Sequence, residues 1–330
     1  MKLQVPFLQL PLSFDAAVLA AEIDALGESV WRPHPQGFPG NSALPLIAVG
    51  GDPGDDAVRG PMRPTPPLAK LPYLRKVLES FGATLGRSRL MRLSGQAEVT
   101  PHVDIDYYWR EHIRVHVPIV TQPQVRFYCG DADIHMAAGE CWIFDTWRRH
   151  KVVNAQSQAR IHLVADTVGG PGFWPLVSAG RVPGVAQPAW RARAVAPGGA
   201  EPVLRYEAVN LPTVMTPWEV REHLVFVLED AREHPALDTL HFQIADFCRR
   251  WRALWACHGE NRAGWPEYRA EVERFRADLA GLPRDLFLHN GITAQLAIAH
   301  LVCDVAVVDE ARADLADERS APMEHAGGMA

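Results

Sequence analysis

The spacing of hydrophobic residues predicts two helices near the N-terminus. Residues 14–26 and 68–81 carry apolar side chains at intervals of three to four, as the buried face of a helix does. Ser13 is placed to cap the first of these helices. Residues 31–67 are rich in glycine and proline, which predicts an ordered, winding loop region in place of regular elements.

The period changes to two near residue 87 and stays close to two up to about residue 168. This stretch consists of six short segments rich in β-branched and aromatic residues and separated by turn residues: RSRLMRLS, IRVHVPIV, QVRFYCG, IHMAAGECWIFD, HKVVNA and RIHLVADTV. Several short strands at such intervals are typical of a β-sandwich or barrel. We therefore predict a mainly β core here.

Helical spacing returns in the C-terminal third. Thr216, Pro217 and Glu219 form the signature of a capped helix start, and this helix is expected to end near residue 234. Three more helices are predicted, at 237–257, 266–279 and 293–308. The resulting division is a β domain with N-terminal helices at 1–170, a linker at 171–212, a helical domain at 213–310 and a disordered tail at 311–330.

Composition narrows the class of partner. The 330 residues are 48% hydrophobic and 22% charged, which excludes a disordered, collagen-like or coiled-coil chain as a whole. The 33 basic and 39 acidic residues give a net charge of −6, so no electrostatic footprint for nucleic acid or an anionic membrane is expected. The partners predicted are small molecules, peptides or protein.

Cysteine usage and the lack of long apolar runs favour a cytoplasmic location. The five cysteines form no CxxC pair and are scattered, which argues against a disulfide framework. Proline and acidic residues interrupt the first residues before a signal-peptide core could form. No later apolar run reaches the roughly 18 residues of a membrane span.

The candidate chemistry begins with a His-x-Asp pair in the β region. His102 and Asp104 lie two apart, so on a strand both side chains point to the same face. His150, on a strand further along the chain, can supply a third ligand. Two imidazoles and one carboxylate that leave positions open are the ligands of non-haem Fe(II) oxygenases. Taken alone, such a pair is more often an ordinary half-buried histidine beside an acid.

Arg160 makes the metal interpretation stronger. It lies in an alternating strand that otherwise reads as buried, and a buried guanidinium needs an anionic partner. An oxygenase that uses a dicarboxylate cosubstrate needs such a clamp for the far carboxylate. Nitrogen and oxygen ligands alone do not select iron over zinc, so the metal is inferred from the whole arrangement.

Six blocks of this region together resemble a known family: PHVD (101–104), RVHVPI (114–119), VRFYCG (125–130), IHMAAGECWIFD (134–145), the histidine of RRHKVVN (148–154) and RIHLVAD (160–166). The chain is similar here to the aspartyl/asparaginyl β-hydroxylase family of Fe(II)- and 2-oxoglutarate-dependent dioxygenases. That family has a double-stranded β-helix (jelly-roll, cupin-like) core. The resemblance covers about residues 30–170, and the related bacterial free-proline 3-hydroxylases also append a helical domain.

The resemblance implies a role for each matching residue. His102, Asp104 and His150 would bind Fe(II), Arg160 would hold the distal carboxylate of 2-oxoglutarate, and His116 would also contact that cosubstrate. The animal members have glycine at the position of Asp104. The complete triad therefore implies hydroxylation over halogenation, because a halogenase needs the carboxylate position vacated for chloride.

Substrate contacts are less defined. Arg114 matches a position that contacts the substrate carboxylate in members acting on peptides. Arg126 fits an inward substrate contact and a solvated strand residue equally well. The aromatic residues 107–109 are suited to wall a pocket and are not expected to be all core, and Asn41 is a further candidate.

The function implied is hydroxylation of an unactivated carbon, with succinate and CO2 as co-products. The substrate stays open between a free amino acid or derivative and a peptide that contains Asp or Asn. The alternative is a non-catalytic or zinc-loaded cupin-like binding protein, which would not need the triad and Arg160 together. The helical domain could cover the barrel mouth, bind a larger substrate or a carrier, or form a homodimer.

Overall fold

The protein is described by a computed structural model over residues 1–34 and 37–309, so the predicted tail lies outside the described residues. The described residues form two compact units, which meet in the sequence between Asn210 and Leu211. The first unit contains the sheets and all the candidate site residues.

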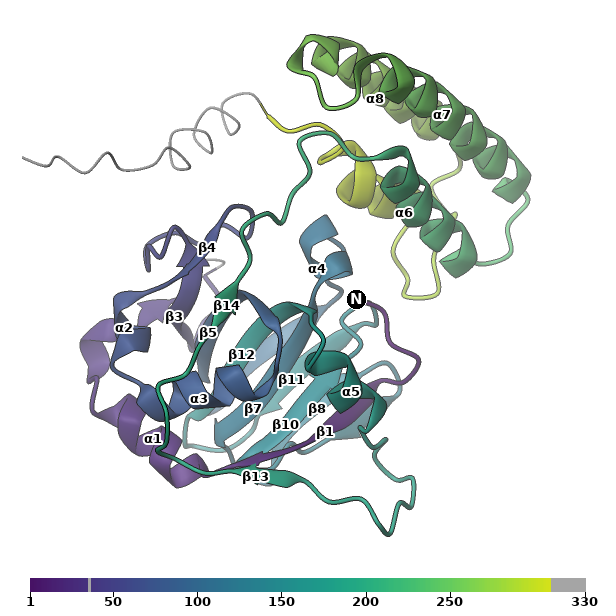
Figure 1. Cartoon of the computed structure of the whole chain (residues 1–330). Helices are drawn as coiled ribbons and strands as arrows, with labels where there is room; N and C mark the ends of the chain where they lie inside the picture. The colour runs from purple at the N-terminus through teal and green to yellow at the C-terminus, as the bar shows by residue number, and fades with distance from the viewer. Residues whose placement is uncertain (35–36, 310–330) are drawn as a thin grey trace, which may run out of the picture. The chain divides into compact units, whose positions relative to one another are not determined.

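Two sheets form the first unit (Figure 1). The larger has ten strands in the order β13-β1-β10-β7-β12-β5-β3-β2, with β14 beside β5 and β4 beside β3. Its strands are β1 (Phe7–Phe14), β2 (Arg32–Pro33), β3 (Asn41–Val49), β4 (Met62–Pro64), β5 (Thr84–Leu93), β7 (Ile113–Val120), β10 (Glu140–Phe144), β12 (Arg160–Gly169), β13 (Arg193–Val195) and β14 (Arg205–Tyr206). The smaller sheet has the order β6-β11-β8-β9, with β6 (Ala97–His102), β8 (Val125–Cys129), β9 (Ala132–Ile134) and β11 (His150–Asn154).

The two sheets enclose an apolar core. Phe7, Leu93 and Phe144 of the larger sheet pack in one buried cluster with Phe127 and Val152 of the smaller. Alternate side chains of each strand enter this core, as the period of two requires. The predicted fold class, a double-stranded β-helix core with an α-helical C-terminal region, is confirmed.

Three helices cover the opposite face of the larger sheet: α1 (Ala16–Asp24), α2 (Pro66–Ala69) and α3 (Pro72–Ser80). Figure 1 shows α1 and α3 against the strands. Leu74 and Val77 of α3 pack with Leu44 of β3 and Leu90 of β5 in a second buried cluster. Full burial of one such side chain contributes about 1.5–3 kcal/mol. The predicted helix 68–81 is divided, because Pro72 starts a new helix after Ala69.

Two predictions near the N-terminus are wrong. Ser13 lies in β1 and caps no helix; the carboxylate of Asp15 caps α1 by accepting from the amides of Ala17 and Val18. The predicted loop 31–67 contains β3, which pairs with β5 on one side and with β2 and β4 on the other. β3 is buried on both faces, so its sequence shows no alternation that would mark it as a strand.

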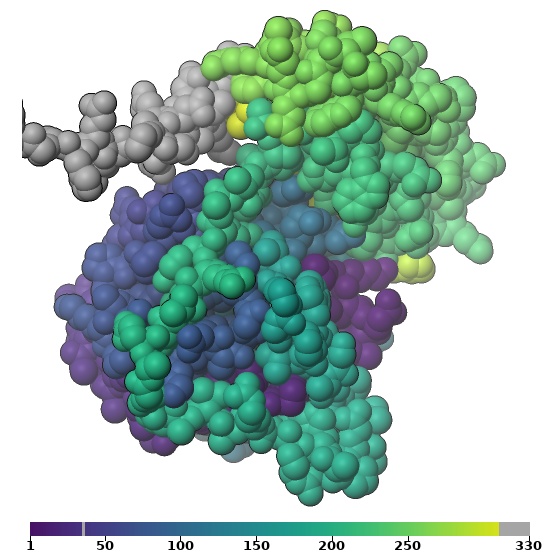
Figure 2. Space-filling view, in the orientation of Figure 1, coloured from purple at the N-terminus to yellow at the C-terminus, as the bar shows by residue number. Residues whose placement is uncertain are grey.

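The segment predicted as a linker, 171–212, is mostly part of the first unit. It contains helix α5 (Phe173–Ser178), then β13 parallel to β1 and β14 parallel to β5. Between these strands the backbone amide of Val203 donates to Glu79, and Arg75 pairs with Glu201. Figure 2 shows this stretch as a band across the surface of α3. The linker interpretation fails because glycine and proline here shape a chain that hydrogen-bonds to the sheet and to α3.

The second unit is helical, as predicted. It contains α6 (Pro217–Asp230), α7 (Leu237–His258), α8 (Trp265–Ala280) and α9 (Ala294–Ile298), which continues as a π-helical turn (Ala299–Cys303). The hydroxyl of Thr216 accepts from the amide of Glu219, which confirms the predicted cap. The last helix ends earlier than the predicted residue 308.

Aromatic packing holds α7 against α8. Phe247 and Phe275 stack with ring centroids 4.1 Å apart, and the indole of buried Trp251 donates to the carbonyl of Met215. Phe242, also on α7, is 68% exposed and lies outside this packing. Within residues 1–34 and 37–309, no helix is long and apolar enough to cross a membrane.

Candidate metal and cosubstrate site

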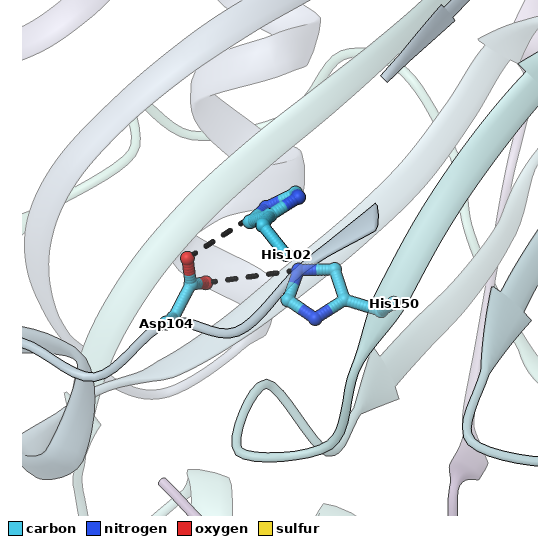
Figure 3. A group of neighbouring side chains, drawn as sticks. All are labelled: His102, Asp104 and His150. Carbon is cyan, nitrogen blue, oxygen red and sulfur yellow. Dashed lines mark ion pairs between the residues drawn. The ribbon is translucent and has the colours of Figure 1, made fainter. Parts of the chain in front are cut away.

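The predicted metal ligands meet at one end of the smaller sheet. His102 is the last residue of β6, Asp104 follows it, and His150 begins the neighbouring strand β11. One ligand atom from each residue lies within 4.8 Å of those of the other two. Figure 3 shows Asp104 turned toward both imidazoles, with Nε2 of His102 at 3.8 Å and Nε2 of His150 at 3.9 Å from its carboxylate oxygens.

Backbone carbonyls orient the two imidazoles. Nδ1 of His102 lies 2.8 Å from the carbonyl of Thr100, and Nδ1 of His150 lies 2.9 Å from that of Arg148. When Nδ1 carries the proton, Nε2 keeps its lone pair for a metal. Burial lowers the pKa of His150 to about 4, so this ring is neutral near neutral pH.

Asp104 is held in its ionised form. Burial raises its pKa, but Arg114, His150 and His102 together lower it below its ordinary value. Nη1 of Arg114 donates to Oδ2 of Asp104 over 3.1 Å, while its Nε donates to Asp166 over 3.0 Å. Arg114 therefore bridges a candidate metal ligand and a buried aspartate. Its predicted contact with a substrate carboxylate would have to compete with these two partners.

Arg160 is a buried cation without a hydrogen-bonded anion. Its side chain starts on β12 with only 4% of the residue exposed, and Nε and Nη2 have no hydrogen-bond partner among the described residues. The guanidinium lies 5.4 Å from the ring of Phe127, and burial lowers its pKa to about 9. Because an unpaired buried cation is costly, this site fits a ligand that brings a carboxylate.

Two buried histidines lie beside Arg160. The rings of His116 and His162 are 5.8 Å apart, and no ring nitrogen of either has a hydrogen-bond partner among the described residues. Burial, with Arg160 as the next cause, lowers the pKa of both well below the ordinary value. The contact of His116 with the cosubstrate stays a prediction. His162 lies on β12 two residues from Arg160, so both side chains leave the same face of the strand.

Arg126 is not brought to this site. On β8 the adjacent Phe127 enters the core between the sheets, so Arg126 faces the other way. Its Nε donates to the carboxylate of Asp133 on β9 over 2.8 Å, at the surface. Of the two interpretations left open by the sequence, the structure agrees with the solvated strand residue.

The aromatic segment 107–109 lies in a short helix, α4 (Tyr107–Glu111). Tyr108 is fully buried, and its hydroxyl accepts from the backbone amide of Arg87 over 2.9 Å. Trp109 lies under two guanidinium groups, 4.1 Å from that of Arg114 and 5.0 Å from that of Arg87. Tyr108 is therefore core, whereas Trp109 is only partly buried and contacts Arg114, the partner of Asp104. Asn41 is buried on β3 opposite Leu93, on the face that looks toward the smaller sheet.

Sequence reasoning missed three charged residues on the inner face of the larger sheet: Asp166, Arg87 and Arg89. All three are buried, and Asp166 accepts from Arg114. The sequence spacing did indicate which of these residues share a strand face. Arg87 and Arg89 lie two apart in RSRLMRLS, and Asp166 lies an even number of residues from Arg160 in RIHLVAD. Alternation does not by itself tell the polar-in face from the polar-out face.

Part of the chain is similar to known proteins. Residues 57–169 match the family described as Aspartyl/Asparaginyl beta-hydroxylase. A structure of an oxidoreductase of the 2OG-Fe(II) oxygenase family from Burkholderia pseudomallei aligns at 18% identity over 51% of this chain and 87% of its own, with a TM-score of 0.37. A prolyl-4-hydroxylase from Pseudomonas putida aligns at 17% identity over 50% and 92%, with a TM-score of 0.33. No curated protein matches the sequence.

Proposed function

We propose that the protein is an Fe(II)- and 2-oxoglutarate-dependent dioxygenase that hydroxylates an unactivated carbon. Its substrate would be an amino acid, an amino-acid derivative or a peptide that contains Asp or Asn. The match of residues 57–169 to the aspartyl/asparaginyl β-hydroxylase family supports this proposal. The observation that carries the proposal is the convergence of His102, Asp104 and His150 within 4.8 Å. Two imidazoles and one carboxylate fit Fe(II) and leave positions open for other ligands.

The bound iron, with 2-oxoglutarate and O2, supplies the oxidation: one oxygen atom enters succinate as 2-oxoglutarate loses CO2, and the other enters the substrate as a hydroxyl group. The chain's own residues bind, orient and protect the reactants. Arg160 is suited to the distal carboxylate of 2-oxoglutarate, since its Nε and Nη2 have no other hydrogen-bond partner among the described residues. We propose that His116, on the adjacent strand β7, contacts the same molecule.

Neighbouring residues set the tautomer and ionisation of the three candidate metal ligands. Carbonyls of Thr100 and Arg148 fix the tautomer of the two histidines, and Arg114 keeps Asp104 ionised. Phe127 and Phe144 form an apolar wall beside His116, with ring centroids 5.2 and 5.3 Å from its ring. Such a wall excludes water and strengthens the charge interactions inside.

The test is release of succinate from 2-oxoglutarate, screened with free amino acids, their derivatives and short Asp- or Asn-containing peptides. We expect at least one compound to stimulate succinate release when Fe(II) and O2 are present. A second measurement, the visible absorption of the anaerobic complex with Fe(II) and 2-oxoglutarate, tests the chelate directly. Absence of that band after metal loading would support the zinc-loaded or non-catalytic binding protein instead.

A further inference from the structure

We propose that Glu207 and Asn210 are positioning residues of the metal site, on which they act through helix α4. The helix carries Trp109, and the indole of Trp109 lies against Arg114, the partner of Asp104. This inference rests on the proposed function, because it concerns the metal ligands assigned there. It assigns a role to a segment of the chain that follows the strands of the site.

Glu207 holds the C-terminal end of α4. Its Oε1 lies 2.6 Å from Nε2 of His112, the residue that follows the helix, and both side chains are buried. Nδ1 of His112 lies 2.6 Å from the carbonyl oxygen of Tyr108, and the two rings stack with centroids 3.7 Å apart. Because a carbonyl oxygen only accepts, Nδ1 donates to it and Nε2 faces the carboxylate. Glu207 thus fixes the histidine that closes the last turn of α4.

Asn210 holds the N-terminal end of α4 through a loop. Its Nδ2 donates to the carbonyl of Val58 over 2.9 Å, and its Oδ1 accepts from the amide of Gly60 over 2.7 Å. Between them, Nη2 of Arg59 donates to the two carboxylate oxygens of Asp106 over 3.2 and 3.3 Å. Asp106 is the N-cap of α4. The side chain of Asn210 therefore fixes the loop that pairs with the start of the helix.

The contacts at the two ends of α4 form one network. Nδ2 of Asn210 also donates to Oε2 of Glu207 over 3.2 Å. The network packs so closely on β5 that a Cβ at Gly86 would lie 2.5 Å from the hydroxyl oxygen of Tyr108 and 3.0 Å from Oε2 of Glu207. Glu207 and Asn210 lie outside residues 57–169, so the family match does not account for these contacts.

Trp109 joins this network to the metal ligands. It lies within α4, and its ring centroid is 4.1 Å from the guanidinium carbon of Arg114 and 5.0 Å from that of Arg87. An aromatic face attracts a guanidinium and restricts its position. Nη1 of Arg114 donates to Asp104 over 3.1 Å. A shift of α4 would therefore release Arg114 from the position in which it supports the carboxylate ligand.

Metal affinity, measured without turnover, tests the proposal. Competition with a coloured chelator gives the Kd of the full chain for Zn(II) and, under anaerobic conditions, for Fe(II). We expect Asn210→Ala and Glu207→Ala each to raise this Kd about threefold to tenfold, because the support of Asp104 is weakened. Glu207→Gln should keep the parental affinity, since its amide can still form a hydrogen bond with Nε2 of His112.

A double-mutant cycle shows whether the effect passes through Arg114. In an Arg114→Met background, Asn210→Ala should change the metal Kd no further, because the contact that transmits its effect is gone. The matched control is Glu201→Ala, which removes an ion pair with Arg75 from an exposed carboxylate of the preceding segment. This control should leave the metal affinity unchanged. Thermal unfolding shows that each variant is folded.

Fluorine NMR of the Zn(II)-loaded chain, labelled with 5-fluorotryptophan, follows α4 directly. Trp109→Phe identifies the resonance of Trp109. In Asn210→Ala this resonance should shift or broaden, while those of Trp251 and Trp265 on the helices of the second unit stay unchanged. A loss of stability alone lowers the melting temperature and does not move a single tryptophan resonance of the folded protein.

Three results would overturn the proposal: both alanine variants keep the parental metal Kd, the effects of Asn210→Ala and Arg114→Met add, or the resonance of Trp109 does not move. The proposed function fails separately, since it concerns succinate release by the Fe(II) form. A chain that shows these effects on metal affinity without releasing succinate would contradict the hydroxylase activity and leave the positioning role standing.

Discussion

His150 lies directly opposite His102 in the antiparallel pairing of β11 with β6, and their ring centroids are 4.2 Å apart. Backbone pairing thus brings together two ligands separated by 48 positions in the chain. The ladder holds both side chains before any metal arrives. A preorganised site of this kind binds its metal without reordering the chain.

We expect His102→Ala and His150→Ala each to abolish substrate-stimulated succinate release, because each removes one of three ligands. Metal retention after equilibrium dialysis against Fe(II) under anaerobic conditions should fall with it. His135→Gln is a matched control, because His135 lies in the same unit but outside the ligand group. Activity retained in either alanine variant would contradict the assigned metal site.

Replacement of Arg114 by Met should weaken metal binding by about tenfold to a hundredfold, the usual effect of removing a residue that orients a ligand. The reason is that Asp104 loses its hydrogen bond from Nη1 of Arg114 while staying buried. Competition with a coloured chelator measures the affinity. An unchanged affinity would show that Arg114 does not support the ligand.

Arg160→Met should raise the Kd for 2-oxoglutarate by roughly 30-fold or more, since loss of one partner of a buried charge pair costs about 2–5 kcal/mol. The variant should unfold at no lower temperature than the parent, because it removes a cation whose Nε and Nη2 have no hydrogen-bond partner among the described residues. Calorimetry on the Zn(II) form gives the Kd without turnover. A lower melting temperature with unchanged Kd would point to a structural role.

The affinity for 2-oxoglutarate should depend on alkaline pH through Arg160. Burial lowers the pKa of this guanidinium to about 9, so it is charged below that pH and loses its proton above it. Binding of an anion stabilises the charged form, so affinity should be full near pH 7 and decline as pH rises past about 9. Titration of the Zn(II) form over this range measures the effect. Arg160→Met should show weak binding without this decline.

Glu207 anchors the end of the first unit. It pairs with Nε2 of His112 over 2.6 Å, and the two side chains are 2% and 1% exposed. Glu207→Ala should destabilise the unit by about 1–3 kcal/mol, the usual cost of leaving a buried hydrogen-bonding group unsatisfied. Glu201→Ala is the matched control: its carboxylate is 73% exposed, so about 1 kcal/mol or less is expected. Urea unfolding followed by tryptophan fluorescence measures both.

The stretch with a hydrophobic period of two corresponds to strands in the structure. The side chains of each strand alternate between a face that packs in the core and a face with different surroundings. β3 was missed because both its faces are covered, and β13 and β14 because each is too short to show a period. The helical third was predicted well, since Thr216 and the apolar spacing are local signals.

The candidate site was also predicted from the sequence only in part. His102, Asp104 and His150 were predicted from a local spacing together with a family resemblance, and the structure brings them together. Arg87 and Arg89 were missed because a charged residue on a strand normally faces solvent, and its inward direction follows only from pairing with β12. That information is contained in the register of distant strands.

The stretch shared with the family, residues 57–169, is not a complete folding unit. β3 comes before it and lies beside β5 throughout, while β13 and β14 come after it. Excised alone, it would lose β3 and β1, which pair with β5 and β10, and would expose the backbone of these two strands. Such unpaired strand edges promote aggregation. During synthesis, the larger sheet cannot be completed until β14, which ends at Tyr206, has left the ribosome.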